Sequence, residues 1–158
     1  MKLDPGYPFI VVDLDGTLTD MGHRVRHVTG GKRDFEAFYA GMADDGINWW
    51  CKVLVESLIK AGIIVVLLSA RPKKYESVTK MWLADHGLIL DGEYGIIRLR
   101  LLGREDGTPD YQLKREWFNR YPDHRASIVF AVDDRPRVVR MWREEGVTCL
   151  QCGTQEGG

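Results

Sequence analysis

The most regular feature of this sequence is an alternation between short apolar runs and longer segments in which apolar residues recur every three to four positions. The short runs predict strands buried on both faces, and they cover residues 9–14, 63–69, 95–101, 127–134 and 147–152. The longer segments predict helices over residues 48–61, 74–87, 109–121 and 136–146. This order indicates an α/β fold with a mostly parallel five-stranded sheet flanked by helices.

One segment interrupts the alternation. About 30 residues separate Asp15 from the helix predicted at residues 48–61, and chains below about 40 residues rarely fold alone. We therefore expect a single domain over residues 1–158, with a small helical cap inserted at about residues 19–47 and a glycine-rich tail at residues 153–158.

Aromatic residues in and after this insert invite two interpretations. The spacing of one helix face recurs inside it, at Phe35, Phe38, Tyr39 and Met42. Such a face either packs the cap against the core or offers a platform on which nucleic-acid bases stack, and packing is the favoured interpretation. Trp49 and Trp50 are expected to begin the buried face of the next helix.

Composition is that of an ordinary globular protein. Apolar residues make up 44% and charged residues 28% of the chain, and the net charge of −1 neither favours nor excludes an anionic partner. No apolar run reaches the roughly 18 residues of a membrane span, and the N-terminus lacks the apolar stretch of a secretory signal. Cys51, Cys149 and Cys152 are too few for a disulfide framework. We expect a cytoplasmic protein that makes no membrane contact.

Carboxylates collect at the ends of two predicted strands. Asp13 and Asp15 follow the first strand, and Asp133 and Asp134 follow the fourth. Ligands of parallel sheets bind beyond the carboxyl ends of the strands, so we expect these side chains to converge. Like charges about 4 Å apart repel by roughly 4 kcal/mol at an effective dielectric near 20, so a proton or a cation must separate them. Oxygen ligands favour Mg²⁺, which also collects a substrate phosphate.

The second strand ends in groups that suit that phosphate. Ser69, Ala70 and Arg71 follow it, and the Ser69 hydroxyl lies at a turn where backbone N–H groups are expected to be free. Gly16 and Thr17, after the first strand, are expected to supply further backbone donors with little steric bulk.

A lysine is also needed, because the transferred phosphoryl group carries negative charge. Lys114 is the best candidate, since it lies on the helix that precedes the fourth strand. Asp110 stands one helical turn upstream of Lys114 and could orient it.

An aspartate that faces both the metal and the phosphorus can act as a nucleophile. Asp13 would then form an aspartyl-phosphate. Asp15 would protonate the leaving oxygen and afterwards activate water, and such positioned acid–base help is worth roughly 10²–10⁴ in rate. An alkoxide leaving group needs that proton, whereas an acyl phosphate does not. Asp15 therefore indicates hydrolysis of phosphate monoesters of alcohols.

The motifs resemble those of the haloacid dehalogenase (HAD) superfamily within residues 9–137. They are DLDGT at 13–17, LSARP at 68–72, Lys114, and VDDRP at 132–136. The longer stretches DLDGTLTDMGHR, DYQLK and VDDRPRVVRMWREEGVTCLQ look like the 3′-phosphatase domain of the phage polynucleotide kinase-phosphatases. The resemblance implies a Rossmann-like HAD core and removal of a 3′-phosphate from DNA or RNA ends or from nucleoside 3′-phosphates, with separate kinase or ligase partners in end repair.

The same resemblance implies roles for individual residues. Arg24, Arg71 and Asp110 fall on the family positions for the basic residue after motif I, the arginine after the motif II serine and the aspartate before the motif III lysine. Thr17, Arg24, Ser69, Ala70 and Arg71 would bind substrate. The implied Mg²⁺ ligands are Asp13, the Asp15 carbonyl and Asp133, with Asp134 binding directly or through water.

Two other functions remain open from the sequence. One is a HAD phosphatase for small molecules such as nucleotides or sugars. The other is a phospho-acceptor signalling domain, which also combines clustered acids, Mg²⁺ and a lysine. Asp15 distinguishes the second from a phosphatase, because a slow phospho-switch gains nothing from an acid that hastens hydrolysis.

Overall fold

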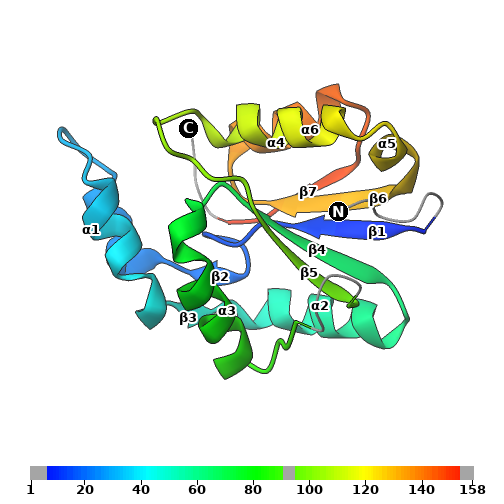
Figure 1. Cartoon of the computed structure of the whole chain (residues 1–158), viewed down its shortest axis with the longest axis horizontal. Helices are drawn as coiled ribbons and strands as arrows, with labels where there is room; N and C mark the ends of the chain where they lie inside the picture. The colour runs from blue at the N-terminus through cyan, green and yellow to red at the C-terminus, as the bar shows by residue number, and fades with distance from the viewer. Residues whose placement is uncertain (1–6, 91–94, 154–158) are drawn as a thin grey trace.

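The computed structural model describes residues 7–90 and 95–153 and contains a five-stranded sheet. The strands lie in the order β5-β4-β1-β6-β7, and every neighbouring pair is parallel (Figure 1). Their bounds are β1 Phe9–Val12, β4 Ile64–Ser69, β5 Ile97–Leu101, β6 Ile128–Asp133 and β7 Cys149–Gln151. The five predicted strands and the predicted α/β fold are confirmed.

Helices cover both faces of this sheet. Figure 1 shows α4 and α6 on one side, with α2 on the other and α3 beside it. Their bounds are α2 Trp49–Lys60, α3 Glu76–Asp85, α4 Asp110–Arg120 and α6 Pro136–Glu144. These are the helices that the apolar spacing predicts. A further short helix, α5 (Asp123–Ser127), has no such signal and was not predicted.

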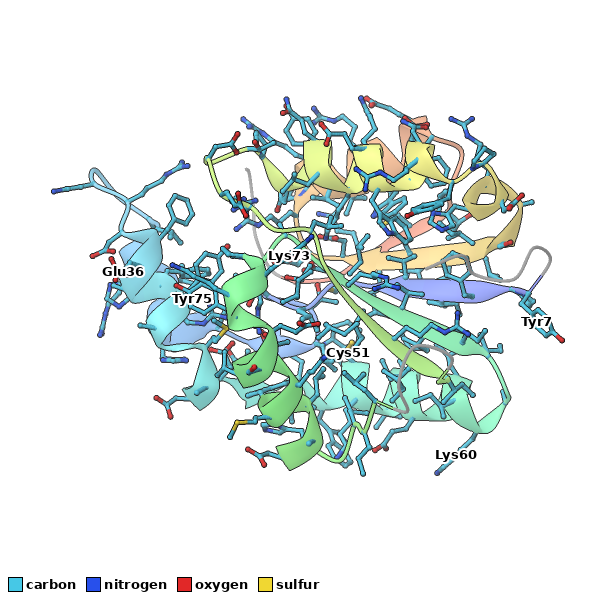
Figure 2. The ribbon with its side chains drawn as sticks, viewed as in Figure 1. Tyr7, Glu36, Cys51, Lys60, Lys73 and Tyr75 are labelled. Atoms are coloured by element: carbon cyan, nitrogen blue, oxygen red, sulfur yellow. The ribbon has the colours of Figure 1, made fainter. Side chains whose placement is uncertain are left out.

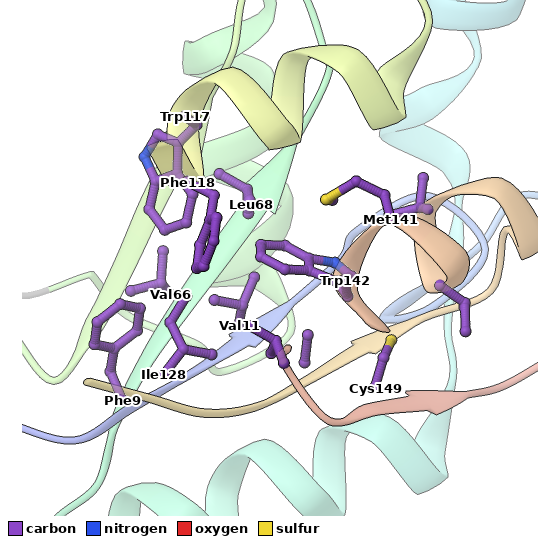
Figure 3. Close-up of a cluster of buried hydrophobic side chains, with 14 residues drawn as sticks. Phe9, Val11, Val66, Leu68, Trp117, Phe118, Ile128, Met141, Trp142 and Cys149 are labelled. Atoms are coloured by element: carbon purple, nitrogen blue, oxygen red, sulfur yellow. The ribbon is translucent and has the colours of Figure 1, made fainter. Parts of the chain in front are cut away.

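The core divides into two layers because side chains alternate across the strands. Phe9 and Val11 of β1 pack toward α4 and α6, where Phe118 and Trp142 meet edge to face with ring centroids 5.8 Å apart (Figure 3). Ile10 and Val12 of β1, together with residues of α2 and α3, form the opposite layer. A strand buried on both faces is what the continuous apolar run predicts.

The prediction for Trp49 and Trp50 is wrong. Their exposed fractions are 66% and 46%. Cys51 and Val55, four residues apart on α2, are the residues that face the sheet. At 100° per residue the two tryptophans that precede Cys51 point away from that buried stripe.

The segment between β1 and α2 folds over the carboxyl edge of the sheet (Figure 1). It contains a short antiparallel pair, β2 (Thr19–Asp20) and β3 (Gly46–Ile47), and the helix α1 (Phe35–Ala40). Two 3₁₀ turns complete it, at Gly22–His27 and Met42–Asp44.

This insert has a small apolar cluster of its own. Phe38, Tyr39 and Met42 are buried there against Met21, and Tyr75 at the start of α3 packs on the same cluster. The packing interpretation of the helix face is therefore confirmed for these three residues. Phe35, the fourth member of the face, is 37% exposed.

Among the described residues, no helix has the length and apolar character that crossing a membrane requires. Residues 154–158 of the predicted glycine-rich tail lie outside the described residues.

Candidate active site

The site begins at the turn after β1, the central strand, which has β4 on one side and β6 on the other. This is the point where the strand order changes direction, and ligands of such sheets bind there. The Asp13 N–H donates to the Val132 carbonyl at 3.0 Å, which joins the end of β1 to the end of β6. Gly16 then reverses the chain with φ +84°, and a Cβ at this residue would overlap the Asp134 carboxylate. Only glycine meets both requirements.

Three carboxylates and one ammonium group form an acid-rich cluster at this turn. Asp13, Asp133 and Asp134 are buried, and each has a carboxylate oxygen within 4.8 Å of the others. The Lys114 Nζ donates to Asp13 Oδ1 at 2.8 Å and to Asp133 Oδ2 at 2.6 Å. The predicted convergence of these three aspartates is therefore present, and α4 places Lys114 among them.

The charges of the acid-rich cluster do not balance. Burial, followed by repulsion from Asp133, raises the pKa of Asp13 well above its usual range despite the opposing charge of Lys114. Burial and the Asp133 charge likewise raise the pKa of Asp134 to about 6. The Lys114 pKa lies above its usual value, because Asp13 and Asp133 outweigh the effect of burial. The buried oxygen donors and the uncompensated negative charge fit a hard divalent cation such as Mg²⁺.

Thr17 contacts the carboxylates instead of presenting free backbone donors. Its Oγ1 lies 3.2 Å from Asp13 Oδ2 and 3.4 Å from Asp134 Oδ1, and its side chain is fully buried. The prediction of free N–H groups here is wrong, because Thr17 N–H donates to the Leu14 carbonyl and Gly16 N–H to the Thr19 carbonyl. The tight turn consumes these donors.

Asp15 lies outside the acid-rich cluster and contacts a pair of arginines, so the prediction that the four strand-end aspartates converge is wrong for this residue. Its Oδ1 accepts from Arg24 Nη2 at 2.5 Å and from Arg71 Nη2 at 2.7 Å, and its Oδ2 accepts from Arg71 Nε at 3.0 Å. Burial alone would raise the pKa of Asp15, but the two guanidinium groups outweigh it and hold that pKa well below its usual range.

Asp45 is a second carboxylate partner of the two arginines, and the sequence did not predict this role. Its buried carboxylate accepts from Arg24 Nε at 2.7 Å and Nη2 at 2.6 Å, and Arg71 Nη2 lies 3.8 Å away. His23 Nε2 is 2.8 Å from the same carboxylate. We call Asp15, Asp45, Arg24 and Arg71 the arginine-paired cluster. Asp45 follows no predicted strand, so only its tertiary contacts reveal it.

The end of β4 and the loop that follows it form another border of the site. Ser69 is buried, and its Oγ accepts from the Arg71 N–H at 3.2 Å. Arg71 Nη1 donates to Thr79 Oγ1 of α3 at 2.9 Å. The Ala70 carbonyl accepts from the Arg104 N–H at 3.1 Å, which fastens this loop to the chain after β5.

Asp110 binds a different partner from the one the helical spacing suggests. Its Oδ2 lies 3.2 Å from Arg135 Nη1 at the start of α6, and its Oδ1 accepts from the Tyr111 N–H. Its charge contributes to the raised pKa of Lys114, after those of Asp13 and Asp133. Asp110 therefore acts on Lys114 through charge and links α4 to α6 directly.

The sheet order and the acidic turn after its first strand define a HAD-type phosphatase domain. The family model of the polynucleotide kinase PNKP phosphatase domain matches residues 8–156. The chain belongs to this family, and the resemblance found in its motifs is confirmed.

A curated relative carries the same region within a longer protein. A putative bifunctional polynucleotide kinase/RNA ligase of Autographa californica nuclear polyhedrosis virus is 28% identical over 138 residues, which are 85% of this chain and 18% of the relative. The chain thus spans only a small part of that protein.

Solved structures agree with this relationship. A chain of the Pnkp1/Rnl/Hen1 RNA repair complex is 26% identical with a TM-score of 0.72, and the match covers 96% of this chain and 44% of that one. A beta-phosphoglucomutase-like structure from Thermotoga maritima has a TM-score of 0.61 at 13% identity, with 96% and 88% covered. The latter likeness shows the shared fold alone.

Proposed function

We propose that this chain is a Mg²⁺-dependent polynucleotide 3′-phosphatase that hydrolyses 3′-phosphate monoesters at DNA or RNA ends through an aspartyl-phosphate. The observation that carries the proposal is the position of Asp13, which contacts Lys114 and stands against Asp133 and Asp134 at the switch point of the sheet. Membership of a family of polynucleotide phosphatase domains supports the choice of substrate.

Asp13 is the nucleophile in this mechanism. One of its carboxylate oxygens attacks phosphorus, and the bond between phosphorus and the sugar 3′-oxygen breaks. Once the substrate phosphate has drawn Arg24 and Arg71 away from Asp15, burial raises the pKa of this carboxyl group and it takes up a proton from solvent. Asp15, two residues further along the same turn than Asp13, then gives this proton to the leaving oxygen. Water then attacks the aspartyl-phosphate, Asp15 accepts a proton from it, and inorganic phosphate leaves with Asp13 regenerated.

The acid-rich cluster holds the metal in this proposal. Asp13 and Asp133 would supply carboxylate oxygens, and Asp134 would bind directly or through water. The Asp15 carbonyl would supply another oxygen ligand. Bound Mg²⁺ would polarise the phosphoryl group and offset the charge that develops on it. Lys114 offsets the remaining charge from a position already fixed by two hydrogen bonds.

Arg24 and Arg71 bind the substrate phosphate by exchange. Both contact Asp15 in the described structure. Phosphate and carboxylate oxygens accept guanidinium donors with the same bidentate geometry, so a substrate phosphate competes with Asp15 for these groups. Ser69 at the end of β4 and Ala70 in the loop that carries Arg71 complete the phosphate site.

The boundaries of the functional unit are part of the proposal. We propose that residues 1–158 act as one phosphatase domain, with residues 19–47 as a small cap that leaves room for a polynucleotide end. The viral relative is named as a kinase/RNA ligase, and the structural relative belongs to an RNA repair complex. Kinase or ligase partners in end repair are therefore the partners we propose.

The decisive experiment compares two oligonucleotides of identical sequence, one phosphorylated at the 3′ end and one at the 5′ end. We expect Mg²⁺-dependent phosphate release from the 3′-phosphorylated strand and at least tenfold slower release from the other. Equal rates on the two strands would remove the 3′-end assignment while leaving a phosphatase. EDTA and an Asp13→Asn variant serve as blanks.

A further inference from the structure

A groove with aromatic and basic walls adjoins the proposed phosphate site. It has a volume of about 530 Å³, within the range of small-molecule sites. Its aromatic residues are Phe35 and Tyr39 of α1 and Tyr75 before α3, and its basic residues are Lys73, Lys74 and Arg104. We call it the aromatic groove. Figure 2 shows Tyr75 between the insert and α3, with Lys73 nearby at the start of α3.

The walls of the groove are tied to the loop that carries Arg71. Pro72, the next residue, lines the groove. The N–H groups of Gly103 and Arg104 donate to the carbonyls of Arg71 and Ala70, both at 3.1 Å. A ligand whose phosphate meets Arg71 would therefore have its neighbouring atoms at the mouth of this groove.

Phe35 and Tyr75 are the rings that a base could reach in this groove, because Tyr39 is buried beneath them in the insert. The Tyr39 and Tyr75 ring centroids are 5.1 Å apart with an interplanar angle of 31°. Lys74 Nζ lies 5.1 Å from the Tyr75 ring centroid. Phe35 is exposed at the rim, although its neighbours on the same helix face are buried in the insert. Bases stack on such rings without regard to their sequence.

The basic residues favour a phosphate at the same place. Within the described part of the chain, Arg104 Nε is buried without a hydrogen-bond partner. Lys73 and Lys74 are exposed beside it. The groove also contains Glu36 and Glu105, which are exposed like the two lysines, so solvent screens all four charges alike. Arg104 is therefore the residue that favours a phosphate here, because its buried nitrogen lacks an acceptor.

We propose that the aromatic groove binds the 3′-terminal nucleotide of a single strand, with its base stacked on the aromatic wall and its 5′-side phosphodiester against Arg104 and the lysines. This inference rests on the proposed function and narrows it. An oligonucleotide supplies both the base and the phosphodiester. A nucleoside 3′-phosphate supplies only the base, and a paired end keeps its terminal base in the duplex.

The first test measures kcat/KM on four substrates: p-nitrophenyl phosphate, a nucleoside 3′-phosphate, a single-stranded 3′-phosphorylated hexanucleotide and a blunt G·C-ended duplex with the same end. We expect the single strand to exceed both the nucleoside 3′-phosphate and the duplex by on the order of tenfold or more. Equal values for the single strand and the nucleoside 3′-phosphate would overturn the inference, and so would a faster duplex. Failure on every 3′-phosphate with turnover of the aryl phosphate would instead remove the proposed function.

The second test uses matched variants. Phe35→Ala should lower kcat/KM on the hexanucleotide by on the order of tenfold and leave the aryl phosphate unchanged. Trp49→Ala, which removes an exposed aromatic ring from α2, should change neither. Equal losses on both substrates in Phe35→Ala would overturn the inference.

The salt dependence of kcat/KM tests the contribution of the basic residues separately from that of the aromatic rings. Arg104→Gln should reduce the slope of log kcat/KM against log salt concentration by about 0.7 for the single strand, the value of one lost phosphate contact. Lys60→Gln removes a charge at the end of α2, far from the groove in Figure 2, and should leave the slope unchanged. An unchanged slope in Arg104→Gln would overturn the assignment of the phosphodiester to this residue.

Discussion

Two clusters of buried charge lie on either side of the turn after β1, and they differ in how their charges are balanced. In the arginine-paired cluster, two carboxylates meet two guanidinium groups. In the acid-rich cluster, three carboxylates share one lysine. Asp13 and Asp15 are separated by a single residue, yet their side chains enter different clusters and their pKa values move in opposite directions.

The difference determines how stable each cluster is before a ligand binds. The arginine-paired cluster satisfies its own charges, so it can hold a fixed shape without a ligand. The acid-rich cluster carries repulsion that an added cation would relieve. A bound cation relieves the repulsion among Asp13, Asp133 and Asp134, and the free energy released in this way favours its binding. This repulsion is the physical basis of the proposed Mg²⁺ site.

Removal of the nucleophile should have the largest effect. Asp13→Asn should lower turnover of a 3′-phosphorylated oligonucleotide by at least about 10³-fold, because the substituted amide cannot attack phosphorus. Its stability without Mg²⁺ should be equal to or above that of the parent, since one repelling charge is gone. Phosphate release and urea unfolding measure the two properties. Retained turnover would rule out the covalent route, and Asp85→Asn on the exposed end of α3 is the control.

Asp45 tests the arginine-paired cluster. Asp45→Asn should lower the free energy of unfolding by about 3–5 kcal/mol, because it leaves buried Arg24 without its main partner. Asp44→Asn changes the exposed neighbour and should have little effect. Urea unfolding measures both. A small change in Asp45→Asn would show that the cluster does not depend on this carboxylate.

Asp134 tests the acid-rich cluster, with the opposite expected sign. In EDTA, Asp134→Asn should raise the free energy of unfolding by about 1–3 kcal/mol, because neutralisation removes the cost of burying a charge and the repulsion from Asp133. Saturating Mg²⁺ should raise the parent's melting temperature by several degrees and the variant's by less. Thermal unfolding with and without Mg²⁺ measures this. Destabilisation of the metal-free variant would contradict the proposed imbalance.

The clusters also show what the sequence could and could not predict. Asp13, Asp133 and Asp134 were predictable, because parallel strands bring their carboxyl ends to one edge of the sheet. Lys114 was predictable as a charge partner on the neighbouring helix. Asp45 was not, because it lies in the insert and its role depends on contacts with Arg24, made across 21 residues of sequence.

The local errors have related causes. Trp49 and Trp50 are apolar residues at the start of a helix. Only the position of the buried stripe around the helix shows that they face away from the sheet. The N–H groups near Thr17 were expected to be free, but the tight turn uses them. α5 is too short to display a period. Periodicity identifies long elements, whereas the ends of elements and single partners are decided by tertiary contacts.

A buried histidine lies far from both clusters and makes its own contribution to the pH dependence of the free energy of unfolding. This contribution must be separated from those of the two clusters before they can be compared. His124 lies in α5, at the opposite end of β6 from Asp133, and packs against the rings of Phe9 and Trp117. Burial lowers its pKa to about 4, although the nearby Asp123 charge acts in the other direction.

The sign of the His124 effect follows from that shift. The unfolded chain takes up a proton at an ordinary histidine pKa of about 6.5, and the folded protein does so only near pH 4. Acidification between these values therefore favours the unfolded chain, by about 1 kcal/mol at pH 5.5. His124→Phe should remove this part of the pH dependence, whereas His27→Gln in the partly exposed region of the insert should retain it. Urea unfolding at pH 7.5 and 5.5 measures the slopes, and equal slopes in parent and His124→Phe would assign the acid response to the charge clusters instead.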